Sequence, residues 1–87
     1  MSLTKSRLEK CADDALEMAL NLKRCSVSLA QDKLWRGAIS ALLVAHYALD
    51  AALEAERGFG GPSNLNLRNA IDCVKISGVW LDEELKG

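Results

Sequence analysis

His46 is the side chain in this sequence best suited to acid–base chemistry, because an imidazole changes its charge near neutral pH. Asp50 follows one helical turn later, where its carboxylate could fix the imidazole tautomer. With Arg36 and Tyr47 they form a candidate polar site, which a dimer cleft could gather from two chains. The interpretation we favour is structural: a buried or interface histidine whose partner is Asp50 or an acceptor from another subunit.

Metal and cofactor sites are not expected from the remaining reactive residues. Cys11, Cys25 and Cys73 include no close pair, and a single histidine adds too little for a zinc site. The glycine-rich loop at residues 58–64 precedes a predicted helix but lacks the Gly-Lys-Ser/Thr of a phosphate-binding loop. An odd number of cysteines also argues against a disulfide framework and favours reduced thiols.

Length, composition and charge indicate one soluble domain spanning residues 1–87. Hydrophobic residues make up 49% of the chain and charged residues 26%, as in ordinary globular proteins. The formal net charge of −1 provides no overall basic field for nucleic acid. The longest uncharged apolar stretch, residues 37–49, is shorter than the roughly 20 residues that cross a membrane. With no secretory signal visible, we expect a cytoplasmic protein.

The first expected helix covers about residues 4–25 and carries an apolar seam with heptad spacing. Ser26 and Val27 disfavour a helix interior, and Ser28 with Gln31 resembles a capping box. We therefore expect a bend or break before Asp32.

The second expected helix, about residues 33–57, carries two apolar stripes and should be central in the fold. One stripe contains large side chains together with His46. The other contains only small ones, which would let a neighbouring helix approach closely: Ala38, Ala41, Ala45, Ala48, Ala52 and Ala55. Gly58 should end this helix, with Phe59 folding back on its last turn.

Two short helices are expected after the turn at residues 60–62. Ser63 or Asn64 would cap the first, about residues 64–76, which ends at Gly78. Its inner face would contain Leu67, Ala70, Ile71 and Val74. The second, residues 79–86, would turn Trp80, Leu81 and Leu85 inward. The predicted fold is therefore all-α and bundle-like, with two long antiparallel helices and two short ones.

A homodimer is expected because two short helices cannot cover two long ones along their length. The residues expected in the core or at the oligomer interface lie on the first two helices. They are Leu8, Met18, Leu22, Trp35, Ile39, Leu42, Ala45, Leu49 and Leu53.

Residues 8–57 resemble the opening helical hairpin of HEPN domains. The resemblance is carried by residues 8–12 (Leu-Glu-Lys-Cys-Ala), 33–39 (Lys-Leu-Trp-Arg-Gly-Ala-Ile) and 46–53 (His-Tyr-Ala-Leu-Asp-Ala-Ala-Leu). It implies a dimeric α-bundle of the kind found in RNase toxins, antitoxin partners and nucleotide-binding accessories. The RNase members carry an Arg and a nearby His on a late helix, whereas here the single His46 lies ten residues after Arg36. Ribonuclease activity is therefore not expected.

The function expected from the sequence is protein association through a homo-oligomer, without catalysis, cofactor or metal, and with a further protein partner as an option. One alternative is a HEPN-like accessory or toxin–antitoxin-type protein that binds nucleotide or RNA. Another is a helical bundle that binds a small ligand in a cavity left by the alanine-rich helix.

Overall fold

Three long helices account for most of the chain in the computed structural model, which describes residues 4–25 and 31–87. They are α1 (Lys5–Lys23), α2 (Asp32–Glu56) and α3 (Leu65–Leu85). A short 3-10 turn, η2 (Gly61–Ser63), precedes α3. The described residues contain no strand, so the all-α prediction is confirmed.

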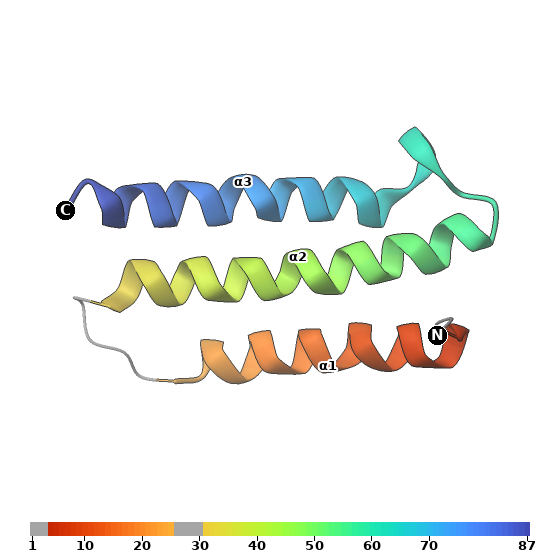
Figure 1. Cartoon of the computed structure of the whole chain (residues 1–87), viewed down its shortest axis with the longest axis horizontal. Coiled ribbons are helices and arrows are strands. Elements are labelled where there is room, and N and C mark those ends of the chain that lie inside the picture. Colours follow the sequence, from red (N-terminus) through yellow and green to blue (C-terminus); the bar gives the residue numbers. More distant parts are fainter. Residues whose placement is uncertain (1–3, 26–30) are drawn as a thin grey trace.

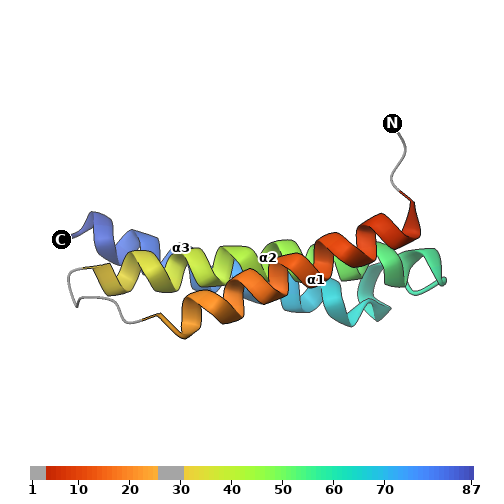
Figure 2. The ribbon, with the colours of Figure 1, turned by 90° about the horizontal axis from the view of Figure 1, so that it is seen from below.

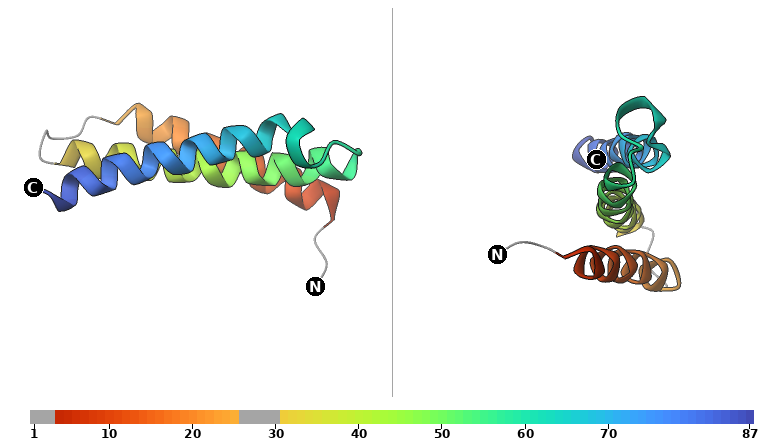
Figure 3. Two further views of the ribbon diagram at one scale, coloured as in Figure 1. Left: turned by 90° about the horizontal axis from the view of Figure 1, so that it is seen from above. Right: turned by 90° about the vertical axis from the view of Figure 1, so that its right-hand side faces the viewer.

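The helices lie side by side in a single layer, with α2 in the middle (Figure 1). Each helix runs antiparallel to its neighbour, and α2 packs against both α1 and α3. Viewed from below, the long helices cross at small angles (Figure 2). Viewed along the helices, α3, α2 and α1 stand in one row (Figure 3). The expectation of a central second helix is met, but a layer leaves two of its faces open.

Capping residues define the ends of the helices. The Thr4 hydroxyl accepts a hydrogen bond from the Arg7 amide at 3.3 Å and begins α1. At the end of α2, Gly58 has a φ of +98°, and the Phe59 amide donates to the Glu54 carbonyl at 3.1 Å. This is the Schellman arrangement expected from Gly58. The bend or break expected between Cys25 and Asp32 falls on residues 26–30, which lie outside the described residues together with Ser28 of the expected capping box. Gln31, its other member, makes no side-chain cap hydrogen bond.

The two short helices expected near the C-terminus are a single helix of 21 residues, α3. Gly78 does not end it: its φ is not positive, and a Cβ there would meet nothing within 4 Å. A glycine inside a helix costs only about 1 kcal/mol relative to alanine. Contacts on both sides of Gly78 offset this, because Ser77 donates to the Gly37 carbonyl and Leu81 packs on Gly37.

The face that α3 turns toward α2 differs from the predicted one. Of the four residues expected to face inward, only Ala70 is buried, and Ile71 is 48% exposed. The buried row continues through Ser77, with Trp80 half-buried. Leu85, expected to turn inward, is 86% exposed. The apolar pattern was misleading because the large apolar side chains of α3 lie mostly outside the contact with α2.

Close helix approach occurs at Gly37 and not along the alanine stripe of α2. A Cβ on Gly37 would lie 2.7 Å from the Leu81 Cδ2, so only glycine fits there without a shift of Leu81. The six alanines of the stripe are all exposed. Within the described structure, no other helix of the chain covers them.

The core is small and consists mainly of alanine. Its buried apolar residues are Ala12, Ala15, Ala19, Ala51, Leu53 and Ala70. Leu53 is therefore the one large apolar side chain among the described residues that is buried.

By length and composition alone, α2 is also apolar enough to cross a membrane, the one such helix found in the described part of the chain. Core helices of soluble proteins meet the same criterion, so the observation is not specific.

Candidate functional site

His46 lies between α1 and α2, where both of its ring nitrogens have partners. It is 8% exposed. Its Nδ1 is 2.7 Å from the carbonyl oxygen of Ala12 on α1, and its Nε2 is 3.3 Å from Oδ2 of Asp50. Tyr47 packs edge-on against the imidazole, with 5.0 Å between the ring centroids. The histidine thus joins two helices through a buried hydrogen bond.

The partners of His46 determine which nitrogen carries a proton. A carbonyl oxygen can only accept, so Nδ1 must donate to Ala12. In the neutral ring this leaves Nε2 without a proton beside Asp50, whereas in the protonated ring Nε2 donates to the Asp50 carboxylate. Neither nitrogen points into an open cleft, which a general base would require.

Arg36 does not join His46, Tyr47 and Asp50. It lies ten residues before His46, which is about 15 Å along a helix. Its Nε donates to Oδ2 of Asp32 at 2.8 Å, and its guanidinium lies 5.1 Å from the centroid of the Trp80 ring. Arg36 therefore links the first turn of α2 to the last turns of α3. The candidate polar site is split into a histidine cluster and a separate arginine contact.

The residues expected in the core or at an interface differ widely in exposure. Leu53 is buried, whereas Met18 (55% exposed) and Ala45 are exposed. The others are half-buried: Leu8, Leu22, Trp35, Ile39, Leu42 and Leu49.

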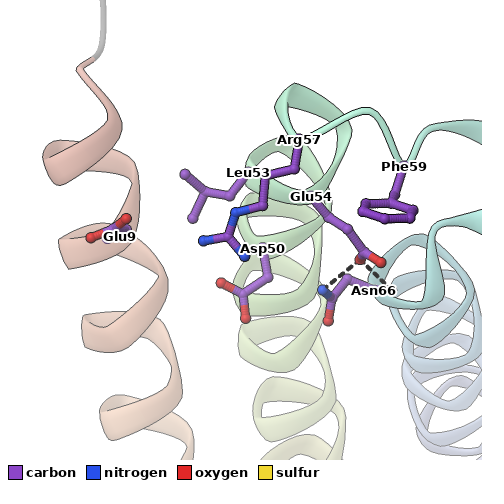
Figure 4. A pocket seen from close by; sticks show the side chains of 7 residues that line it. All are labelled: Glu9, Asp50, Leu53, Glu54, Arg57, Phe59 and Asn66. Atoms are coloured by element: carbon purple, nitrogen blue, oxygen red, sulfur yellow. Dashed lines mark hydrogen bonds between the residues drawn. The ribbon is translucent and has the colours of Figure 1, made fainter.

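A cavity of about 510 Å³ lies where the C-terminal end of α2 meets the starts of α1 and α3 (Figure 4). It is lined by Glu9, Asp50, Leu53, Glu54, Arg57, Phe59 and Asn66. Two of its carboxylates are already engaged. Asp50 Oδ2 lies 3.3 Å from Nε2 of His46, and Glu54 accepts from the Asn66 side-chain amide at 2.8 Å.

Sequence reasoning did not find this cavity, because its lining comes from three helices and the loop after α2. The closest signal was Gly58, which ends α2 and thereby places Phe59 over its last turn. In Figure 4 the Arg57 side chain extends toward the space between α1 and α2. The cavity has charge of both signs but no arrangement of a nucleophile against a base.

Comparison of the chain with protein-family models, with curated protein sequences and with solved structures finds no match.

The remaining polar groups of the described residues do not assemble into a reactive centre. Every buried side-chain nitrogen or oxygen among them has a hydrogen-bond partner. No three histidine, cysteine or acidic side chains in residues 4–25 and 31–87 are grouped as metal ligands would be. Cys11 and Cys25 are exposed, whereas Cys73 is half-buried. Burial raises the pKa of the Cys73 thiol, and the neighbouring Asp72 carboxylate raises it further.

Proposed function

We propose that this protein is a self-associating helical module, in the simplest case a two-fold homodimer, with no catalysis of its own. The observation that carries the proposal is the small core. Among the described residues, five of the six buried apolar ones are alanines, and no large side chain is fully buried. A chain of 87 residues needs substantial apolar burial to offset the conformational entropy lost on folding. Burial between chains would provide it.

The surface area and shape of the molecule support the same proposal. Its accessible surface is 6101 Å², whereas a folded monomer of this mass exposes about 5,000 Å². The radius of gyration is 14.5 Å, whereas a compact domain of this length has about 12 Å. The excess of roughly 1,000 Å² is similar to the area that one partner contributes to a standard interface, about 800 Å².

The polar features have structural roles that fit a module without catalysis. His46 bonds α2 to α1, and Arg36 contacts Trp80 on α3. A HEPN-like role in binding nucleotide or RNA stays a hypothesis from the sequence, because no geometry among the described residues adds to it.

Light scattering of the purified chain over a range of concentrations tests the proposal. We expect a mass of at least twice the 9.4 kDa of one chain at micromolar concentration. A mass of 9.4 kDa at every concentration, with the helices intact by circular dichroism, would overturn it.

A further inference from the structure

One side of the helical layer carries exposed apolar residues on all three helices, and charged residues such as Asp14 of α1 and Asp82 of α3 lie on the same side at its flanks. We call these apolar residues the apolar face. Each of its residues is exposed: Cys11 and Met18 on α1; Leu34, Ala38, Ala41, Ala45, Ala48 and Ala52 on α2; Leu67, Ile71, Val74 and Leu81 on α3. None of these side chains carries a charge.

The opposite side of the layer can be located from contacts between helices. Glu54 of α2 bonds to Asn66 of α3 and shares a cavity with Glu9 of α1, so these residues lie on one side. Arg36 lies five turns before Glu54 on the same side of α2, and it contacts Trp80 of α3. We call this side the polar face, defined by Glu9, Arg36, Glu54, Asn66 and Trp80.

Helix geometry then places the apolar face opposite the polar one. In an α-helix, residues nine apart are separated by about two and a half turns and point in opposite directions. Met18 lies nine residues after Glu9, and Ala45 lies nine before Glu54. Ile71 lies nine before Trp80. The same offset holds in all three helices, so Met18, Ala45 and Ile71 lie together on the far side of the layer.

We propose that the apolar face binds the apolar face of a second copy of this chain, with a two-fold axis near Ala45 and α2 antiparallel to its partner. This inference rests on the proposed self-association and identifies its surface. The product is a bundle of two layers, three helices each, with both polar faces turned to solvent.

The shape of the apolar face favours a second copy. Along its middle, α2 presents only small side chains between Ala38 and Ala52, so two α2 helices can approach at the short end of the 8–10 Å range. On its flanks, larger side chains such as Met18 (55% exposed) and Val74 (55% exposed) can reach across to the other layer. The alanines are spaced almost symmetrically about Ala45: Ala38 and Ala41 lie seven and four residues before it, and Ala48 and Ala52 lie three and seven residues after it. When a second α2 runs antiparallel across an axis near Ala45, the alanines of one helix therefore lie against the alanines of the other.

Charge and area also favour this occupant. On α2, Arg36 and Asp32 form an ion pair within the chain, and Asp50 lies 3.3 Å from Nε2 of His46. Along α2, the exposed residues of the apolar face between Leu34 and Ala52 are all uncharged, so a second apolar face matches this central strip and a charged partner would find no counter-charge there. The roughly 1,000 Å² of excess surface is enough for one side of a stable dimer.

Ala45→Glu tests the inference. Glutamate forms helices well, but in the dimer it would place a carboxylate without a partner against its own symmetry mate. We expect the dimer dissociation constant to rise about 100-fold or more, measured by light scattering or analytical ultracentrifugation. Asn69→Glu is the matched control, because Asn69 is exposed and lies eleven residues, about three turns, before Trp80 on the polar side of α3, and the change adds the same charge. The control should stay dimeric.

Crosslinking provides a measurement that does not need the disrupted variant to fold. In a background with Cys11→Ser, Cys25→Ser and Cys73→Ala, a cysteine introduced at Ala45 should couple two chains through a thiol crosslinker of about 10 Å, near the spacing of packed helices. A cysteine at Asn69, on the polar side of α3, in the same background should not.

The outcomes separate the inference from the proposed function. A dimer that crosslinks at residue 45 and loses affinity with Ala45→Glu supports both. A dimer that crosslinks through a cysteine at residue 69 but not at 45, or that keeps its affinity with Ala45→Glu, overturns the apolar face as the interface and leaves self-association standing. A wild-type chain that is monomeric at every concentration overturns both, and its binding to lipid vesicles would then identify a membrane surface as the occupant.

Discussion

Individual polar residues in this protein connect helices. His46 shows how: its spacing from Asp50 is visible in the sequence, but its 2.7 Å contact with the Ala12 carbonyl joins positions 34 residues apart. Because of this contact, His46 is a buried hydrogen-bonding group between α1 and α2 and not an accessible base. Glu54 and Asn66 act similarly between α2 and α3.

Cys73 should react more slowly with thiol reagents than Cys25. Burial and the nearby Asp72 raise the pKa of the Cys73 thiol, so at a given pH below that pKa a smaller fraction is thiolate, the reactive form. Cys25 is exposed. In chains that retain one cysteine each, we expect modification of Cys73 at neutral pH to be several-fold slower. The difference should shrink as the pH rises and the thiolate fraction of Cys73 grows.

Equal rates for the two thiols in the folded chain would contradict this expectation. Repeating the measurement in denaturant provides the control, because the burial of Cys73 is then lost.

Single capping residues determine where the helices end and begin. Gly58 and Asn64 frame the connection between α2 and α3. Gly58 allows the positive φ that ends α2, and Asn64 begins α3 by accepting from the Leu67 amide at 3.0 Å. Asn64 also donates to the Ala51 carbonyl at 2.8 Å and is 3% exposed. It therefore fixes where α3 starts and how α3 lies on α2.

Asn64→Ala should destabilise the fold by about 1–3 kcal/mol, because it removes both the helix cap and a buried hydrogen bond. The measurement is chemical denaturation of the variant and the wild type at one protein concentration. Ser63→Ala is the control: Ser63 bonds only locally, to the exposed Gly60 carbonyl, so its loss should stay within about 0.5 kcal/mol. Equal losses for both variants would show that the Asn64 contacts add nothing.

At the scale of the whole molecule, the single-layer arrangement governs stability. The helices α1 and α3 flank α2 in one row (Figure 3), and the large apolar side chains of the described residues, apart from Leu53, stay half-buried or exposed. Under the proposed self-association, covering the apolar face adds to the stability of the fold. This dependence connects stability to association.

Unfolding should therefore depend on protein concentration. For a dimer that unfolds to two separate chains, each tenfold increase in concentration stabilises the folded state by about 1.4 kcal/mol. We expect the thermal midpoint, followed by circular dichroism, to rise steadily over at least two decades of concentration. Ala45→Glu should remove most of this rise, whereas Asn69→Glu should keep it. A midpoint that does not move with concentration would mean that the single layer is stable by itself.

Local signals in the sequence were sufficient to predict the helices and several of their ends. The periodicity of residues 33–57 predicted α2 almost to its observed bounds of Asp32–Glu56, and Gly58 predicted the geometry of its cap. Such features depend on neighbouring residues and so can be read along the chain. Gly78 was misleading because a helix tolerates one glycine when tertiary contacts support it.

The tertiary structure alone decided which stripes became core, because packing depends on how each helix rotates against its neighbour. It buried Ala70 and Ser77 where larger apolar residues were expected, and it left the alanines of α2 exposed. It also brought Glu9, Arg57 and Asn66 to one cavity and separated Arg36 from His46. The amphipathic period determined that these segments are helices with apolar stripes. The contacts between helices determined which of those stripes remain open for a partner.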